Sequence, residues 1–540
     1  MFTLLFLGFF TAASAAPVLV TPLIEAGQLE LARNLTAINY KGVFHGYAGH
    51  FTTANTQYAD RDNHIYTWFQ PCSNCDSATA PLLIWLQGGP GGPGWFGAFA
   101  EIGNTFIGGD TTDSEPHPRC FSWCMTNNCL FVDQPVNTGF SYQTMKATGK
   151  PVTDVTQVKY TDLSSAAMEQ VLSVLLQFYQ VFPEVQQAPL TITGESYGGL
   201  YTPNLGYLIA QHNTNTSETF KINFAGLAVG DPCINWGRQM LTYADTLYGM
   251  GVLMIDERED LRARMASSAS QLDNCPVAFH IWNQVWDDNG GLGPSLGRGW
   301  FAQKTGSFNT ANVLMGNSPS GWNEIFQFWS KDVASAAFHV LNVPAPSNAT
   351  LNGINVYDAF VQSGDWCANS SWLYADLMLN TDIDLMIYSS TSDPLLGPPT
   401  TEAGVFAILD DAVSQSTVAG QKIAKAFQAT AKDIWYVDTK KDVNPAGYAK
   451  CISVDNNMEG RENKEKAARA QSSRFCYAVV RNAGHETPGY QPRAAYDMIE
   501  RFLEKRSFDA SGDDTTDFPT CSECSGVGPF AGAALPTCAK

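Results

Sequence analysis

Residues 194–199, Gly-Glu-Ser-Tyr-Gly-Gly, constrain the fold of this chain more than any other stretch of its sequence. A strand-like run, residues 189–193, precedes them, and Leu200 and Tyr201 follow. The order is that of a strand, a sharp turn and a helix. Glycines on both sides of a serine let the backbone turn tightly enough to leave the hydroxyl exposed above the sheet edge, as in a nucleophile elbow. This pattern predicts an α/β fold with Ser196 as the candidate nucleophile.

A serine hydroxyl needs a histidine base and a carboxylate that orients the histidine, and in this type of fold they follow the serine in the order acid, then histidine. Of the histidines after Ser196, only His485 follows a β-branched run, residues 477–480, in a short loop. Asp393 follows the buried-strand pattern of residues 384–388 at a turn. Taken singly, Asp393 could be an ordinary surface aspartate at a turn, and His485 could be an ordinary capping histidine. The required order favours a triad of Ser196, Asp393 and His485.

A glycine-rich loop follows another predicted buried strand, residues 81–86, and reads Gln-Gly-Gly-Pro-Gly-Gly-Pro-Gly over residues 87–94. Such a loop commonly supplies one oxyanion donor, and the residue after the nucleophile supplies the other. We expect these to be the amides of Gly89 and Tyr197. A phosphate-binding loop is the alternative, but the sequence has neither the Walker pattern nor a dinucleotide-binding glycine pattern.

Five sequence blocks carry a family resemblance, and they lie in order at residues 47–51, 81–91, 131–142, 193–203 and 483–488. In these blocks the chain resembles the serine carboxypeptidases, an acid-active branch of the α/β-hydrolases. The resemblance implies an α/β-hydrolase fold, with a mixed, mostly parallel central sheet, helices on both faces and an inserted cap. It also implies release of C-terminal amino acids from peptides and proteins through an acyl-enzyme at acid pH, without a metal or other cofactor.

Members of this family bind the substrate's terminal carboxylate beside the glycine loop, with two glutamates that share a proton. The matching residues here are Trp85, Gln87, Gly88, Glu101 and Glu195. Two carboxyl groups in contact cannot both ionise cheaply, so one keeps a proton and can donate it to a substrate carboxylate. We therefore expect activity on peptides to fall as the pH rises. Without the resemblance, Glu101 would be interpreted as a solvated helix residue.

The chain departs from the family pattern close to this site. Gln87 stands where the family usually has Asn, which keeps the amide donor but changes its reach. Residues 92–94 replace a usual Cys-Ser-Ser, so we expect no disulfide to anchor the loop. Asn137 replaces a usual glycine, and residues 390–391 replace the usual Gly-Asp before the catalytic acid. These changes bear on substrate preference and loop rigidity more than on the reaction.

Composition bears on partners and location. The formal net charge is −20, and an acidic surface repels phosphate backbones, so nucleic-acid binding is excluded. Residues 1–16 resemble a signal peptide, with an uncleaved anchor as the alternative. We expect a secreted monomer or homodimer with no stable membrane association, acting on peptides with a free C-terminus. An acidic vacuole-like or lysosome-like compartment is the alternative location.

Thirteen cysteines indicate disulfides in an oxidising compartment, and the odd number leaves at least one unpaired. Two C-x-x-C pairs, at 72–75 and 521–524, could instead bind zinc, but no nearby histidine pair completes a tetrahedral site. Four N-x-[ST] sequons mark possible glycosylation sites at Asn34, Asn215, Asn348 and Asn369.

The motif positions suggest how the chain is divided. We expect a signal peptide (1–16), a first part of the hydrolase core (17–232), an inserted cap (233–370), a second part of the core (371–506) and an irregular tail (507–540). The tryptophans of the cap could line substrate subsites or fill a small cap core; they are Trp282, Trp286, Trp300, Trp322 and Trp329. Two other functions stay open, an acyltransferase on the same scaffold and a non-catalytic protective or binding protein.

Overall fold

The computed structural model describes residues 17–54, 57–108, 114–154, 156–286, 299–306, 309–315, 322–343, 354–438, 440, 442–454 and 473–509. The expected signal peptide, the sequon at Asn348, the second C-x-x-C pair and all but the first residues of the tail lie outside this range. Within it, no helix combines the length and the apolar character needed to cross a bilayer.

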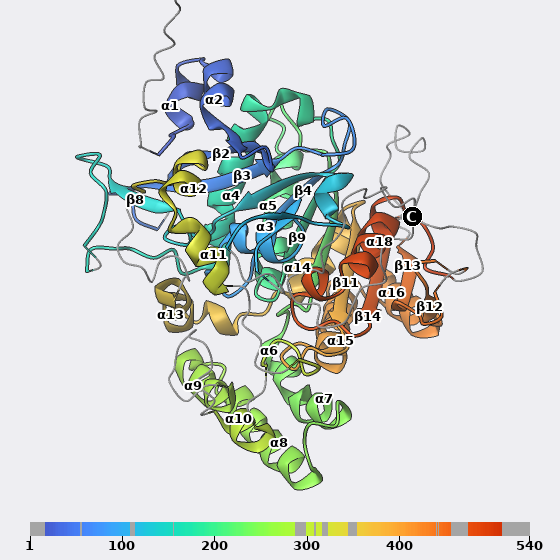
Figure 1. Ribbon diagram of the computed structural model, residues 1–540. Coiled ribbons are helices and arrows are strands. Elements are labelled where there is room, and N and C mark those ends of the chain that lie inside the picture. The colour runs from blue at the N-terminus through green and yellow to red at the C-terminus, as the bar shows by residue number, and fades with distance from the viewer. Residues whose placement is uncertain are drawn as a thin grey trace, which may run out of the picture.

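A single large sheet organises the molecule (Figure 1). Its strands lie in the order β1-β2-β3-β7-β4-β9-β10-β11-β14-β13-β12, and β8 pairs with β3. The bounds are β1 (Ala37–Tyr40), β2 (Phe44–Ala54), β3 (Arg61–Gln70), β4 (Leu82–Leu86), β7 (Asn128–Val132), β8 (Tyr142–Met145), β9 (Leu190–Glu195), β10 (Phe224–Gly230), β11 (Asp384–Ser390), β12 (Asp433–Trp435), β13 (Gly447–Val454) and β14 (Ser473–Val480). Strands β5 (Thr105–Phe106) and β6 (His117–Pro118) form a separate small ribbon.

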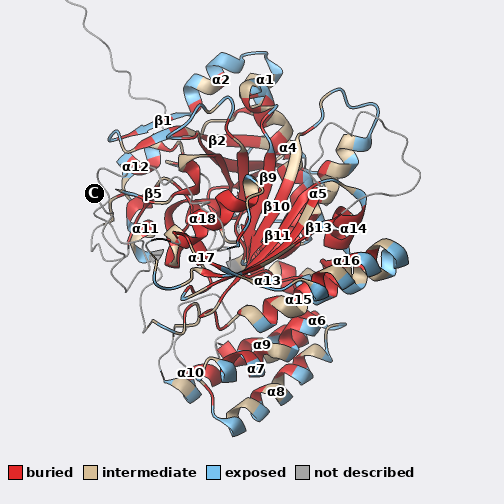
Figure 2. Ribbon diagram, turned by 90° about the vertical axis from the view of Figure 1, so that its right-hand side faces the viewer, coloured by how far each residue is buried: buried red, intermediate tan, exposed pale blue. Residues whose placement is uncertain are grey.

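The middle of the sheet, from β7 to β14, is parallel, and antiparallel strands flank it on both sides. Its strands are buried on both faces, as Figure 2 shows, which explains why they are continuously apolar in sequence. Side chains alternate between the two faces: Leu82, Ile84 and Leu86 enter one core, whereas Leu83 and Trp85 enter the other. The mixed sheet with two cores confirms the predicted α/β-hydrolase fold.

Helices cover both faces. One core holds α1 (Thr21–Glu25), α2 (Leu29–Thr36), α4 (Ser164–Val181), α5 (Gly198–Thr214), α14 (Ser371–Asn380), α15 (Pro398–Gln415) and α16 (Thr417–Ala429). The other holds α3 (Gly94–Ala100), α11 (Trp322–Trp329), α12 (Asp332–Ala337) and α18 (Pro492–Leu503). Short helices also occur between these elements, namely α17 (Thr487–Tyr490), η1 (Trp123–Met125), η2 (Pro183–Val185), η3 (Met240–Thr242) and η5 (Asp365–Cys367).

Helices from the expected cap region gather at one end of the sheet in Figure 1: α6 (Trp236–Gln239), α7 (Tyr243–Gly249), α8 (Ile255–Ala269), α9 (Cys275–Trp286), α10 (Trp300–Thr305) and α13 (Ile354–Ser363). A disulfide between Cys275 and Cys367 ties α9 to η5. Helices α11 and α12 belong to the same stretch of sequence but pack in the second core with residues of β1–β3.

Aromatic packing accounts for three of the tryptophans expected in the cap, and the fourth, Trp300, is buried and donates through Nε1 to Asp260 (2.7 Å). Trp282 contacts Trp236, Trp286 and Trp366, and Trp286 also contacts Tyr243 and Phe301. Trp329 lies instead in the second core against Trp95, Phe99 and Phe140. These contacts favour the interpretation as core residues; the side chain of Trp322 is outside the described part of the structure.

Disulfides are present as the cysteine count suggested: Cys72–Cys75, Cys124–Cys129, Cys275–Cys367 and Cys451–Cys476. Because Cys72 and Cys75 are bonded to each other, the zinc alternative for this pair was wrong. Cys233 is a free, buried thiol.

Candidate active site

The nucleophile elbow lies between β9 and α5. Ser196 has a positive φ of 58°, a conformation that β-carbon-bearing residues rarely adopt. A β-carbon on Gly194 or Gly198 would lie 2.7 or 2.8 Å from the carbonyl oxygen of Leu86, so only glycine fits at these positions. Ser196 is partly exposed between buried neighbours. The local sequence therefore presents its hydroxyl at the carboxyl end of the sheet.

Asp393 and His485 come to the same edge from loops after β11 and β14. Parallel strands place their carboxyl ends together, so residues far apart in sequence meet here. His485 Nδ1 lies 2.7 Å from Asp393 Oδ2, and the Leu395 amide donates to Asp393 Oδ1 over 2.7 Å. Asp393 is fully buried. Burial acts to lower the pKa of His485, but the Asp393 carboxylate outweighs it and raises that pKa above its ordinary value.

Residues 309–315, between α10 and α11, brace both loops. The amide of His485 donates to the carbonyl of Ala311 over 2.7 Å, and the amide of Val313 donates to the carbonyl of Ser392 over 2.9 Å. A β-carbon on Gly484 would lie 2.5 Å from the carbonyl oxygen of Ala311. Residues 309–315 thus hold the acid loop and the histidine loop through backbone contacts.

The glycine loop lies directly against the elbow. A β-carbon on Gly88 would lie 2.6 Å from the carbonyl oxygen of Glu195 and 2.7 Å from Ser196 Cβ and from Tyr197 N. Gly89 has a φ of 113°, which favours glycine. The amide of Tyr197 precedes α5, where amides lack an intrahelical acceptor. This arrangement suits the expected oxyanion donors, the amides of Gly89 and Tyr197.

Another carboxylate supports the glycine loop. Asp133 is buried and accepts hydrogen bonds from the amides of Trp95 (3.3 Å) and Phe140 (2.9 Å). Burial raises the pKa of Asp133 to about 7. Polar contacts of Asp133, which follows β7, thus hold the residue after the glycine loop.

A buried polar chain runs beside the triad through the predicted carboxylate-binding residues. Trp85 Nε1 donates to Gln87 Oε1 (2.7 Å), and Gln87 Nε2 donates to Glu195 Oε1 (3.3 Å). Glu101 and Glu195 act on each other's pKa, and a proton on one of them would let the two buried carboxyl groups hydrogen-bond. Gln87, Glu101 and Glu195 are each at most 5% exposed. Glu195 Oε1 lies 3.9 Å from His485 Nε2, so the pair adjoins the base.

Burial dominates the electrostatics of this pair. It raises the pKa of Glu101 to about 7, although the hydrogen bond with Glu195 acts in the opposite direction. Burial also raises the pKa of Glu195 well above its ordinary value, and the charge of Glu101 adds to this effect. At acid pH the pair therefore offers hydrogen-bond donors to an anion.

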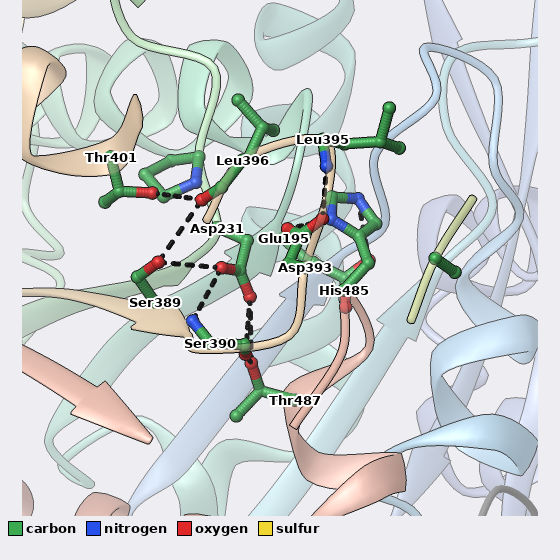
Figure 3. A network of polar contacts seen from close by, with 12 residues as sticks. Glu195, Asp231, Ser389, Ser390, Asp393, Leu395, Leu396, Thr401, His485 and Thr487 are labelled. Atoms are coloured by element: carbon green, nitrogen blue, oxygen red, sulfur yellow. Dashed lines mark hydrogen bonds and ion pairs between the residues drawn. The ribbon is translucent and has the colours of Figure 1, made fainter. Parts of the chain in front are cut away.

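Two acidic residues at the site escaped sequence analysis. Asp231 follows β10 and lies, fully buried, beside Asp393 and His485 (Figure 3). Glu486 follows the base, and burial raises its pKa, with His485 opposing. Asp231 carries the same signal that identified Asp393, an acid directly after an apolar strand. Asp231, Asp393 and His485 are also the one group of potential metal ligands found in the described residues, but His485 and Asp393 are hydrogen-bonded to each other, and Asp231 accepts from Ser389, Ser390 and Thr487.

The arrangement combines a nucleophile, a paired base and acid, candidate oxyanion donors and a buried anion-binding chain. These parts suit acyl transfer on a substrate that carries a carboxylate.

Comparisons with known proteins agree with this chemistry. The family model described as serine carboxypeptidase matches residues 38–505. Venom serine carboxypeptidase from Apis mellifera is 29% identical, covering 91% of this chain and 92% of that protein. Vitellogenic carboxypeptidase from Aedes aegypti is 27% identical, covering 91% of each chain. Among solved structures, Kex1(delta)p, a prohormone-processing carboxypeptidase from Saccharomyces cerevisiae, has the same fold, with a TM-score of 0.64, 16% identity, and coverage of 88% of this chain and 96% of that one.

Proposed function

The chain belongs to the serine carboxypeptidase family, and on this premise we propose that Ser196, His485 and Asp393 carry its reaction, the release of C-terminal amino acids from peptides. Ser196 Oγ attacks the last peptide carbonyl while His485 Nε2 accepts its proton, and Asp393 orients the imidazole through Nδ1. The amides of Gly89 and Tyr197 stabilise the oxyanion. His485 then protonates the departing amino acid, and water hydrolyses the acyl-enzyme by the same route.

The observation that carries this proposal is the buried chain Trp85–Gln87–Glu195–Glu101 beside His485. A protonated carboxyl that adjoins the base can donate to the terminal carboxylate of a peptide, which places the last peptide bond next to Ser196. An acyltransferase would use the same triad but would have no need for an anion site at the leaving-group side. Protonation of the pair also explains why acid pH suits the reaction.

The test compares N-blocked dipeptides with their C-terminal amides from pH 3 to 8, using wild-type protein and Ser196→Ala. We expect release of the free amino acid from dipeptides at acid pH, much weaker cleavage of the amides, and none with the variant. Equal cleavage of both substrates would contradict the carboxylate site. No release by folded wild-type protein at any pH would overturn the peptidase assignment, and activity in Ser196→Ala would overturn the role of Ser196.

We further propose that the protein is secreted or delivered to an acidic compartment. Its disulfides need an oxidising environment to form. The sequons at Asn34, Asn215 and Asn369 lie at exposed residues, where glycans could be attached. Digestion with a glycosidase and a shift in mass would test glycosylation, and fractionation of expressing cells and medium would test export.

A further inference from the structure

Asp231 occupies a buried position between the two catalytic loops. It follows β10 with a φ of 41°, and its side chain is fully buried. One carboxylate oxygen of Asp231, one of Asp393 and one ring nitrogen of His485 all lie within 4.8 Å of one another. Figure 3 shows its carboxyl group facing the end of β11 and Thr487.

Its hydrogen bonds join three segments of the chain. Oδ1 accepts from Ser389 Oγ (3.1 Å) and from the amide of Ser390 (2.9 Å), both at the end of β11. Oδ2 contacts Ser390 Oγ (3.0 Å) and Thr487 Oγ1 (2.8 Å). Asp393 lies on the loop that follows Ser390, and His485 lies two residues before Thr487. Asp231 therefore connects the acid loop to the histidine loop.

The proton count in these hydrogen bonds favours a neutral Asp231. Ser390 Oγ and Thr487 Oγ1 are also hydrogen-bonded to each other, so with Asp231 Oδ2 they form a ring of three oxygens and three contacts. Each contact needs one proton, and the two hydroxyls supply two. All three contacts are hydrogen bonds at the same time only if Asp231 supplies the third proton.

The surrounding charges favour the same state. Titratable groups that act on or are affected by Asp231 are Asp393, His485, Glu195, Tyr388 and Tyr477. Burial raises the pKa of Asp231 well above its ordinary value, and the charge of Asp393 raises it further, while His485 opposes. One imidazole cannot neutralise two buried carboxylates together with the nearby glutamates.

We propose that Asp231 is a positioning residue that works as a neutral carboxylic acid, fixing the loop of Asp393 to the loop of His485 without placing a second anion beside the imidazole. This inference rests on the roles proposed above for Asp393 and His485. An ionised Asp231 would stabilise the imidazolium form of His485, which cannot accept the proton of Ser196. A neutral acid keeps the hydrogen bonds and adds no further increase to the pKa of His485.

The test compares Asp231→Asn, Asp231→Ala and wild type on an N-blocked dipeptide and on the ethyl ester of an N-blocked amino acid, which lacks the terminal carboxylate. The asparagine side chain keeps a hydrogen-bond acceptor and a donor but carries no charge. We expect Asp231→Asn to retain kcat within about threefold, with the acid limb of its kcat/KM profile unmoved. Asp231→Ala should lose kcat on the order of a hundredfold on both substrates, with little change in KM, because the loops are no longer fixed.

Asp384→Asn is the matched control, because Asp384 is a buried carboxylate at the other end of β11, where it accepts from the amide of Arg474 (2.8 Å) and pairs with Lys505. It should change stability but neither limb of the pH profile. The inference is overturned if Asp231→Asn is as impaired as Asp231→Ala, or if its acid limb moves to lower pH, since that shift would mean that an anion had been removed.

Infrared difference spectra of wild type minus Asp231→Asn test the protonation state directly and do not depend on whether Asp231→Ala folds. A protonated carboxyl band at acid pH supports the inference, and carboxylate bands alone overturn it. The two proposals fail separately: absence of Ser196-dependent release by wild type would overturn the proposed function, whatever the spectra show.

Discussion

At the scale of single residues, the site is notable for how many carboxyl groups it buries around one histidine. Glu101, Glu195, Asp231 and Asp393 are all at most 3% exposed. Only Asp393 is directly hydrogen-bonded to the imidazole. Burial raises the pKa of the other three, so at acid pH they can keep protons and donate to the substrate or to a neighbouring loop.

Glu101→Gln tests the substrate side of this arrangement. For wild type we expect KM for an N-blocked dipeptide to rise as the pH passes about 7, where burial places the pKa of Glu101, because ionisation removes a donor and adds a charge that repels the substrate carboxylate. A glutamine amide donates at every pH, so KM of the variant should change much less over this range. Kinetics from pH 5 to 8.5 check this, with the C-terminal amide of the same dipeptide as control. An equally steep rise of KM in the variant would contradict the assignment.

At the scale of elements, the glycine loop and the elbow touch without room for a side chain. Gly88→Ala would place a β-carbon within 2.7 Å of backbone atoms of Glu195 and Tyr197, so the loop must move away from Ser196. We expect kcat/KM to fall by roughly a hundredfold or more, comparable to the loss of an oxyanion donor, while the protein stays folded.

Gly249→Ala is the control for that change, because a β-carbon there meets nothing within 4 Å and the residue ends helix α7. Its activity should equal that of wild type. Full activity of Gly88→Ala would show that the loop does not need this close contact.

The positions of the strands and helices also show which parts of the site can be predicted from sequence and which cannot. Ser196, Asp393 and His485 could be identified because each follows a strand of the parallel sheet, and that topology brings strand ends together. The same rule applies to Asp231, yet a sequence pattern cannot tell which of two acids after neighbouring strands faces the histidine. The hydrogen bonds that join residues 311 and 313 to the catalytic loops depend on long-range packing and leave no local signal. Trp329 was expected in the cap, but it lies in the second core. Sequence could not predict this, because the position of Trp329 depends on how α11 packs back against the sheet.

At the scale of the whole molecule, protons held by buried groups couple stability to pH. For Glu101, Glu195, Asp231, Asp133 and Glu486 the folded pKa is raised. Their contribution to the free energy of unfolding is complete below the ordinary carboxyl pKa and is lost as the pH rises through the folded values. For Glu101 the change from 4.5 to about 7 corresponds to about 3 kcal/mol.

Buried histidines act in the opposite direction. Burial lowers the pKa of His50 to about 3 and that of His64 to about 4, and it also lowers the pKa of His339. Their contribution to the free energy of unfolding is complete above the ordinary histidine pKa and is lost as the pH falls through the pKa values of the folded state. The five carboxyls outnumber the three histidines, and the net charge of −20 at pH 7 adds repulsion as the pH rises.

We therefore expect Tm to be higher at pH 5 than at pH 8 by several degrees. Thermal unfolding followed by circular dichroism checks this, using Ser196→Ala so that self-cleavage does not contribute. In that background Glu101→Gln should reduce the difference between the two pH values. A higher Tm at pH 8 would show that the buried carboxyls do not hold their protons in the folded state.

The distribution of the site along the chain also affects when the molecule becomes active during its synthesis. Gln87 and Ser196 are made early, whereas Asp393, His485 and Thr487 come late, and the bracing segment 309–315 lies between them. A growing chain therefore carries its nucleophile long before it has a base. Peptide cleavage by the proposed triad can begin only after His485 has been made and has folded against Asp393. A chain that is cut off before His485 would have the nucleophile without its base.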